Sequence, residues 1–413
     1  MGNRIANVPV FVEGLDASAY GIARSLGRNG ISSIALDGKN KDLLRFSRYC
    51  RGCYTFPNDP TQQRTYADDI IPNEHILYEL LVKWASNSHK KPVLFATSDW
   101  FTRFLCNWQQ ELEPGFLFHW VPKDVFTTIT EKGLIAEFCG KIGIHVPHTL
   151  ITHPEHEAAW IAKETPYPCL VKPNHRQTVQ FPIAAKVFVA RDPYQLEQFF
   201  LSNPQLKGAT LVQELIEGGD DQIFQCTALA KHSGATVHAT VRKLHQYPLR
   251  YGTMCYGQTE RNEELVAESL KLLRALGYRG LGSLEFKYRA SDKNYYFIEM
   301  NTRLPWYNGI FDDAGVNLAY LAYLDLVGES DESVLKKTRQ RDVAWTSFRK
   351  YSAWYRDARK EQSTSLWSWI GSIGRARSFA WWNASDPRPF IASLVFRLRG
   401  FAAGVLKAAG LRK

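Results

Sequence analysis

Apolar and polar positions at the start of the chain alternate in blocks that predict strands separated by helices. The apolar run VPVFVEG ends at Gly14, and residues 17–30 then show helical spacing with a glycine stop. ISSIALD predicts a second strand, and PVLFATSD (92–99) predicts a third after another helix. Strands alternating with helices indicate a parallel sheet covered on both faces. We therefore expect an α/β, half-sized Rossmann-like domain over residues 1–122.

The turn after the first strand argues against a dinucleotide site. It reads Gly14-Leu15-Asp16-Ala17 and lacks the Gly-x-Gly-x-x-Gly pattern. That pattern allows the backbone to approach a pyrophosphate closely. The sequence therefore excludes a dinucleotide-binding turn after the first strand.

From residue 123 to 335 the pattern changes to short strands, many of which follow one another directly. A Ser-Gly turn separates QIFQCTALA from ATVHATVRKL, which is typical of a hairpin. Helices are predicted at 130–142, 193–202, 261–277 and 314–328. This mixture predicts a second domain of α+β type.

Carboxylates near two late strands suggest a site for hard cations. We expect Glu285 at the end of the alternating strand SLEFKY, and Glu299 with Asn301 at the end of another, FIEMNTR. Residues two apart on a strand point to the same face, and Mg²⁺ prefers oxygen ligands completed by substrate phosphates. The alternative is two ordinary surface glutamates on edge strands.

Three further segments suit a nucleotide. Lys172 is a charged residue in the apolar strand LVKP, where a phosphate would be a suitable partner. Gln213-Glu214-Leu215-Ile216 has the extended character of a hinge that could contact an adenine edge, and Asp220 and Asp221 follow it. A solvent-facing lysine and an acidic turn are the alternatives.

The order and spacing of these parts resemble those of the ATP-grasp superfamily, and especially its D-aspartate ligase and carbamoyl-phosphate-synthase-like carboxylate–amine ligases. The resemblance covers about residues 1–330 and extends to the Rossmann-like (pre-ATP-grasp) domain. It implies an ATP-grasp domain over 123–335 in two subdomains, with a lid at about 150–212. The series that carries it is Lys132, Lys172, Gln213-Glu214, Asp220/Asp221, Glu285 and Glu299-x-Asn301-x-Arg303.

The resemblance also implies individual roles. Lys132 and Lys172 would contact the ATP phosphates, Gln213 to Glu217 would line the adenine pocket, and either Asp220 or Asp221 would hold the ribose. Two Mg²⁺ ions, for which Mn²⁺ is an alternative, would be held by Glu285, Glu299 and Asn301. Arg303 would neutralise the reacting groups, and Arg242 and Lys243 would position the acceptor or the transferred phosphoryl group. The covering loop at 173–181 departs from the pattern, because it contains no glycine.

These roles imply an enzyme that uses ATP to activate a small carboxylate as an acyl phosphate for attack by an amine, with an amino-acid-type substrate. Phosphoryl transfer depends mainly on positioning and charge neutralisation, which lysines, arginine and magnesium supply. The alternatives are a carboxylate–thiol ligase, a carboxylase, or a non-catalytic nucleotide-binding protein at a membrane.

The basic character of the protein is confined to its C-terminal end. Residues 341–413 contain 14 Lys and Arg against 4 Asp and Glu, whereas the other 340 residues carry 37 of each. A balanced body argues against nucleic acid as a partner. We expect residues 336–413 to form a basic, Trp-rich helical tail, in which Asp386 caps an amphipathic helix. Its apolar face would lie on an anionic membrane, on the enzyme itself or on a second subunit of a homodimer.

Seven cysteines in 413 residues are typical of a reducing compartment. The N-terminus has no cationic lead followed by a long apolar core, so it does not resemble a signal peptide. We expect a cytoplasmic protein, peripheral on the inner face of the cytoplasmic membrane if the tail binds lipid.

Overall fold

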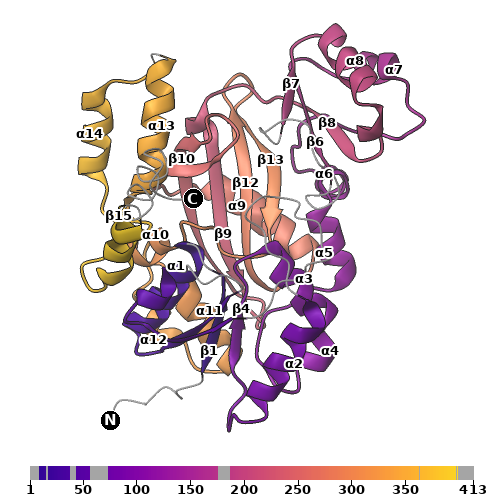
Figure 1. Ribbon diagram of the computed structural model, residues 1–413. Helices are drawn as coiled ribbons and strands as arrows, with labels where there is room; N and C mark the ends of the chain where they lie inside the picture. Colours follow the sequence, from indigo (N-terminus) through magenta and orange to yellow (C-terminus); the bar gives the residue numbers. More distant parts are fainter. Residues whose placement is uncertain are drawn as a thin grey trace, which may run out of the picture.

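The computed structural model contains three β-sheets with helices packed against them (Figure 1). A parallel sheet from the N-terminal part lies below the large central sheet, and a small sheet lies at the upper right. The described residues are 9–14, 17–37, 43–55, 73–174, 187–361, 363–396 and 398.

The N-terminal sheet is parallel throughout, in the order β3-β2-β1-β4. Apolar side chains of its strands are buried between α1 on one face and α2 with α3 on the other. The strand β3 was not predicted, because CRGCYT mixes polar and apolar positions. The elements are β1 Val10–Glu13, α1 Ala17–Arg28, β2 Ser33–Asp37, a 3₁₀ turn Leu44–Phe46, β3 Cys50–Thr55, α2 Glu74–Ala85, β4 Val93–Phe95, α3 Asp99–Asn107 and α4 Gln109–Leu112.

Close packing explains why a glycine, Gly14, directly follows β1. Gly14 has φ +102°, and a Cβ atom there would lie 2.2 Å from Oγ1 of Thr97. The carboxylate of Glu13 accepts hydrogen bonds from the backbone N–H groups of Thr97 and Ser98 at 2.8 and 3.0 Å. Gly14 therefore permits the close approach of two strand ends.

The segment for which a lid was predicted folds as a small antiparallel sheet in the order β5-β8-β6-β7. Two helices pack on it, and the second is capped at its N-terminus by Asp192, whose side chain accepts from the N–H of Gln195. The elements are β5 Thr149–Ile151, α7 Ala158–Lys163, β6 Cys169–Pro173, β7 Phe188–Ala190, α8 Pro193–Ser202, a 3₁₀ turn Pro204–Leu206 and β8 Thr210–Glu214.

The central sheet has seven strands in the order β13-β12-β9-β10-β11-β14-β15, antiparallel except for its last pair. Helices α5, α6 and α9 cover one face, while α1, α10 and α11 cover the lower part of the other. The elements are α5 Lys123–Thr130, α6 Lys132–Lys141, a 3₁₀ turn Asp220–Gln222, β9 Ile223–Ala230, β10 Thr236–Tyr247, β11 Thr253–Thr259, α9 Glu263–Ala275, β12 Gly280–Arg289, β13 Asn294–Asn301, α10 Gly309–Asp313 and α11 Leu318–Val327.

The C-terminal part requires two corrections to the predicted helical tail. First, it is not only helical, because β14 and β15 extend the central sheet and bury Trp345 completely. Second, Asp386 does not cap the following helix: its carboxylate accepts from the Ser47 hydroxyl and the Arg48 N–H. The elements are α12 Glu332–Leu335, β14 Ala344–Thr346, α13 Phe348–Lys360, α14 Leu366–Arg375, β15 Ser378–Phe379 and a helix over 388–396.

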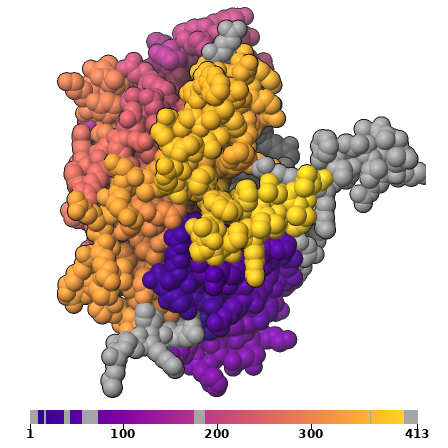
Figure 2. All heavy atoms as spheres, turned by 90° about the vertical axis from the view of Figure 1, so that its left-hand side faces the viewer, coloured from indigo at the N-terminus to yellow at the C-terminus, as the bar shows by residue number. Residues whose placement is uncertain are grey.

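Contacts at Asp386 attach the C-terminal part to the N-terminal sheet. The hydroxyl of Tyr20 donates to the carbonyl of Asp386 at 3.2 Å, and its ring stacks on Trp381. Figure 2 shows the yellow C-terminal residues lying across the indigo N-terminal ones. None of the helices among the described residues combines the length and apolar character that a membrane crossing requires.

A buried arginine joins α1 to α10. The side chain of Arg24 is 1% exposed, and it donates to the carbonyl of Gly309 at 2.8 Å and to Asp313 at 3.0 Å. Arg28, one turn later on α1, pairs with Asp312 and Asp313 from a position 32% exposed. Asp313 thus pairs with one buried and one more exposed cation.

We predict that Arg24→Ala lowers the free energy of unfolding by about 3 kcal/mol, because it empties a buried position and removes the buried partner of the Gly309 carbonyl and of Oδ2 of Asp313. Arg28→Ala is the matched control, and its cost should stay below about 1 kcal/mol because that pair is more exposed. Urea denaturation followed by circular dichroism measures both. Equal losses for the two variants would contradict the assignment.

Candidate active site

Two carboxylates face each other across the β12–β13 pair. The antiparallel register places Glu285 directly opposite Glu299, and Asn301 opposite Ser283. The amide of Asn301 donates to Oε1 of Glu299 at 3.3 Å. The predicted position of Glu285 at a strand end was wrong, since it lies in the middle of β12. The hairpin register, rather than adjacent strand ends, brings the three oxygen-bearing groups together.

Three lysines surround these carboxylates. Lys243 on β10 forms an ion pair with Glu285. From the small sheet, Lys172 donates to Oε1 of Gln213 at 2.7 Å, and Lys132 at the start of α6 donates to the carbonyl of Pro173 at 3.0 Å. The site therefore lies where the two antiparallel sheets meet, between β12–β13 on one side and β6 on the other.

Electrostatic coupling links both sides of this site. Burial, together with the positive charge of Lys132, lowers the pKa of Lys172 from 10.5 to about 7, although Glu299 and Glu285 partly oppose this effect. Lys172 is buried, and a fixed negative charge beside it would restore its protonated form. The arrangement therefore favours an anionic ligand.

Two polar groups that were not predicted also border the carboxylates. The Oε1 atom of Gln225 and the hydroxyl of Tyr307 are buried and have no hydrogen-bond partner among the described residues. Gln225 is the β9 partner of Glu285 in the register. Burial and then the charges of Glu285 and Glu299 raise the pKa of Tyr307. The alternation along IFQCTALA could have revealed Gln225, because it shares the face of Glu285; no sequence signal pointed to Tyr307.

This donor set fits magnesium and phosphate. Two carboxylates and an amide oxygen are ligands that Mg²⁺ accepts while keeping positions for water and phosphate oxygens. Gln225 lies opposite Glu285 on the neighbouring strand β9, and its Oε1 atom has no hydrogen-bond partner among the described residues. Opposed carboxylates repel one another unless cations lie close to them.

The predicted hinge borders the same region. Gln213 is buried and bonded to Lys172, whereas the carboxylate of Glu214 pairs with Arg289 and accepts from the N–H of His148 at 3.1 Å. The remaining hinge positions differ in exposure: Leu215 is half-buried, Ile216 is buried and Glu217 is exposed.

The two candidate ribose ligands differ in their surroundings. Both oxygens of Asp220 accept from Gln246, one from its backbone N–H at 2.9 Å and the other from its side-chain amide at 3.0 Å. The carboxylate of Asp221 is more exposed and lies 3.6 Å from the guanidinium of Arg242. Asp220 therefore stabilises β10, while Asp221 faces outward.

The pair Arg242 and Lys243 is divided between the faces of the sheet. Adjacent strand residues point to opposite faces, so only Lys243 reaches Glu285. Arg242 stacks on Phe224, in the core covered by α9, and donates to the carbonyl of Asp221 at 2.7 Å. The structure thus does not bring Arg242 to the carboxylates, contrary to its expected role beside Lys243.

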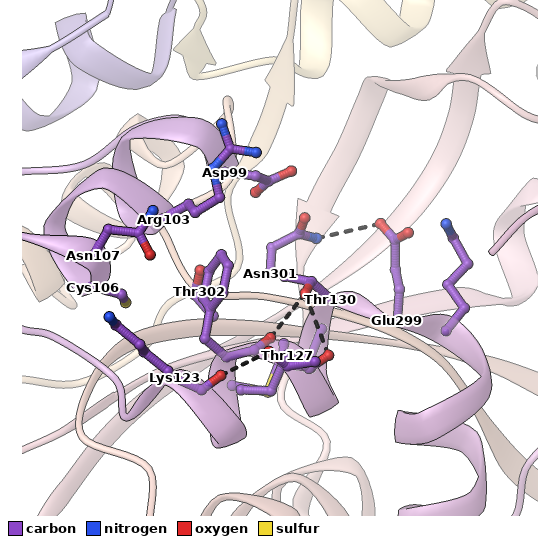
Figure 3. A pocket seen from close by; sticks show the side chains of 14 residues that line it. Asp99, Arg103, Cys106, Asn107, Lys123, Thr127, Thr130, Glu299, Asn301 and Thr302 are labelled. Atoms are coloured by element: carbon purple, nitrogen blue, oxygen red, sulfur yellow. Dashed lines mark hydrogen bonds between the residues drawn. The ribbon is translucent and has the colours of Figure 1, made fainter. Parts of the chain in front are cut away.

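A cavity of about 320 Å³ opens beside Glu299 and Asn301. Arg303 lies just beyond β13 and donates to Oδ1 of Asp99 at 2.8 Å. Figure 3 shows Asn301 directed toward Glu299, with Asp99 and Arg103 of α3 nearby. The cavity is lined by Asp99, Arg103, Cys106, Asn107, Lys123, Phe126, Thr127, Ile129, Thr130, Lys132, Glu299, Met300, Asn301 and Thr302. Residues 175–181 of the covering loop predicted at 173–181 lie outside the described residues.

Comparisons with known proteins agree with the predicted resemblance. The family described as carbamoyl-phosphate synthase L chain, ATP binding domain, matches residues 257–323. D-aspartate ligase of Enterococcus faecium (strain Aus0004) is 22% identical over an alignment of 356 positions, which covers 79% of this chain and 79% of the ligase.

Two solved structures share the fold. Biotin carboxylase of Campylobacter jejuni superposes with a TM-score of 0.63 at 15% identity, covering 83% of this chain and 76% of its own. L-amino acid ligase of Bacillus licheniformis superposes with a TM-score of 0.60 at 14% identity, covering 82% and 79%. The resemblance to ATP-grasp carboxylate–amine ligases is confirmed, and the chain has the ATP-grasp fold.

Proposed function

We propose that this protein is an ATP- and Mg²⁺-dependent ligase that phosphorylates a small carboxylate and joins the acyl group to an amine. The observation that carries the proposal is the group Glu285, Glu299 and Asn301 on one sheet face, with Lys172 and Lys132 across from it. The resemblance to D-aspartate ligase and L-amino acid ligase supports an amino-acid-type substrate.

ATP would bind between the small and central sheets. Lys172 and Lys132 would contact the phosphates, and the hinge from Gln213 to Glu217 would contact the adenine. Because Gln246 already uses both oxygens of Asp220, Asp221 is the better candidate for the ribose. Two Mg²⁺ ions held by Glu285, Glu299 and Asn301 would neutralise the phosphate charge when bound.

The cavity beside Asn301 would hold the carboxylate and the amine. Its lining includes the cations Arg103 and Lys123 and the anion Asp99, which suits a small molecule carrying both charges. Arg303 is held beside the cavity by Asp99, where it would stabilise the charge that develops on the transferred phosphoryl group. Water must be excluded because it would hydrolyse an acyl phosphate.

The proposed function also assigns a role to each part of the chain. Residues 1–122, with their parallel sheet, would be the Rossmann-like pre-ATP-grasp domain, residues 123–335 the ATP-grasp domain with its lid, and 336–413 a C-terminal extension. The similarity to a biotin carboxylase keeps carboxylation as the second candidate chemistry. Amino acids that stimulate ADP release without bicarbonate would distinguish the ligase from the carboxylase.

Glu299→Ala is expected to reduce ADP formation by at least about 100-fold, because one carboxylate of the metal site is lost. A coupled assay for ADP with a panel of amino acids measures the change, and circular dichroism checks the fold. Glu332→Ala is the control, since Glu332 lies on helix α12 and, in the part of the chain that the structure describes, its carboxylate pairs only with Lys336. Undiminished turnover in Glu299→Ala would refute the metal assignment.

Nucleotide binding should take up a proton at Lys172. Its pKa is about 7 without ligand, and phosphate oxygens would raise it. Affinity for a non-hydrolysable ATP analogue should therefore fall as pH rises above about 7, by up to about tenfold per pH unit until the bound pKa is reached. Calorimetry in buffers of different ionisation enthalpy measures the uptake.

Lys172→Arg should remove this proton uptake, because arginine stays charged throughout the range. Affinity that does not change with pH in the unaltered protein would show that Lys172 does not contact the phosphates.

We further propose that α14 contacts an anionic membrane surface. Its side chains Leu366, Trp367 and Ile370 are exposed, Trp367 by 79%, and Arg375 lies at its end. Exposed aromatic and basic residues on one amphipathic helix suit the lipid–water interface. The exposed apolar residues of the last helix would add to this contact, among them Ile391, Leu394 and Leu398.

The double variant Trp367→Ser, Ile370→Ser should lose sedimentation with phosphatidylglycerol vesicles, while neutral phosphatidylcholine vesicles should pellet neither form. Tyr194→Ser is the matched control. Tyr194 is also an exposed aromatic residue, 71% exposed, but it lies on α8, which packs on the small sheet and not in the C-terminal part. Equal pelleting of all forms would remove the membrane role and leave packing on protein as the alternative.

A further inference from the structure

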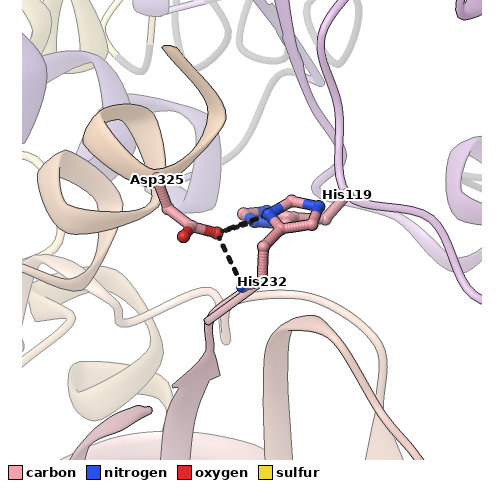
Figure 4. A group of neighbouring side chains, drawn as sticks. All are labelled: His119, His232 and Asp325. Atoms are coloured by element: carbon pink, nitrogen blue, oxygen red, sulfur yellow. Dashed lines mark hydrogen bonds and ion pairs between the residues drawn. The ribbon is translucent and has the colours of Figure 1, made fainter. Parts of the chain in front are cut away.

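Two histidines and an aspartate meet at a second site that the proposed reaction does not use. The Nε2 atom of His119 lies 3.0 Å from Oδ2 of Asp325, and the Nδ1 atom of His232 lies 2.8 Å from the same oxygen. The ligand atoms of all three residues lie within 4.8 Å of one another. Figure 4 shows both imidazole rings directed at the carboxylate from one side.

The three residues come from distant parts of the chain. His119 lies in the segment before α5, His232 in the turn between β9 and β10, and Asp325 on α11. His119 packs against Gly280, where a Cβ atom would lie 2.6 Å from its own. Gly280 begins β12, so the cluster is about 16 Å along that strand from Glu285. None of the three residues lines the cavity.

The spacing of these atoms suits a metal ion. Bonds of about 2.0–2.2 Å from Zn²⁺ to imidazole nitrogen and carboxylate oxygen separate neighbouring ligand atoms by about 3 Å. The two measured nitrogen–oxygen distances are close to this value. The rings of His119 and His232 stack at 5.3 Å, so both can approach one ion from adjacent directions.

The charge states of the groups are compatible with metal binding, in which each ring proton would move to the nitrogen that faces away from Asp325. Burial lowers the pKa of His119, with Asp325 opposing and His232 reinforcing the effect, and this keeps the ring neutral. Burial alone would raise the pKa of Asp325, but hydrogen bonds from both histidines outweigh it and hold the value at about 2. Neutral imidazole and ionised carboxylate are the forms that bind metal.

We infer that His119, His232 and Asp325 bind a zinc-class transition-metal ion, with water in the remaining position. Imidazole ligands favour such ions over Mg²⁺, which prefers oxygen. His232 is 58% exposed and gives the ion access from solvent, whereas His119 and Asp325 are mostly buried. The three segments already meet through three hydrogen bonds at Oδ2 of Asp325, one of them from the backbone N–H of His232 at 3.3 Å. The ion would add to these links and so stabilise the contact between the N-terminal third and the central sheet.

The test measures zinc binding by the full-length protein after treatment with EDTA. In excess Mg²⁺, we expect one equivalent of Zn²⁺ to bind in competition with a chromogenic chelator and to raise the melting temperature. His232→Ala should reduce zinc affinity by at least about tenfold, by the cost typical of losing one metal-ligand partner. Its exposed position makes this variant the one least apt to disturb the fold.

His153→Ala is the matched control. His153 is also an exposed histidine that lies beside a second one, His156, but the two form a pair of histidines without an aspartate between them. It should bind zinc as the unaltered protein does. Asp325→Asn should also lose the site, with circular dichroism reporting its fold. No zinc binding by the unaltered protein, or full binding by His232→Ala, would overturn the inference. Neither result depends on ligase activity.

Discussion

Two glutamates placed directly opposite each other on neighbouring strands are the feature on which the rest of the site depends. Like charges in this position repel, so the Glu285–Glu299 pair requires positive charge close by. Lys243 supplies some of it from within the same sheet, through its ion pair with Glu285. Lys172 faces the carboxylates from the other sheet and Lys132 from the start of α6, where burial makes it costly for both to be charged. The site is thus prepared for a ligand that carries both metal and phosphate charges.

The fold holds these groups by contacts between remote segments. The central sheet presents one face to α9 and its apolar core, and the lower part of its other face packs against α1, α10 and α11. The upper part therefore remains available for polar groups. The C-terminal part completes this arrangement, since β14 covers the edge of β11 and Asp386 is fixed to Ser47.

Much of this arrangement could be predicted from the sequence. The alternation in SLEFKYR correctly placed Glu285 on a strand, and the spacing of Glu299 and Asn301 correctly placed both on one face. The register between the strands could not be predicted, because a slip of one residue reverses every side chain and depends on long-range packing. The separation of Arg242 from Lys243 has a different cause, because adjacent residues of a strand point to opposite faces. It could have been predicted, but it was missed because both residues were assigned one role.

Other errors have local causes. Asp386 precedes a proline and a helical pattern, as a capping residue would, yet a tertiary contact with Arg48 occupies its carboxylate. The strand β14 is only three residues long and is stabilised by its neighbours rather than by its own pattern. Tyr307 lies in an irregular segment, and only the fold reveals that its hydroxyl is buried near the carboxylates.

The central claim is that Glu285 and Glu299 hold metal against the terminal phosphates of a nucleotide. Phosphorus NMR of a non-hydrolysable ATP analogue, bound to the protein with traces of Mn²⁺ as a paramagnetic substitute for Mg²⁺, tests it most directly. The account predicts strong broadening of the β- and γ-phosphorus resonances, and loss of the protein-dependent broadening in the double variant Glu285→Gln, Glu299→Gln. Broadening of the same size in both proteins would contradict it.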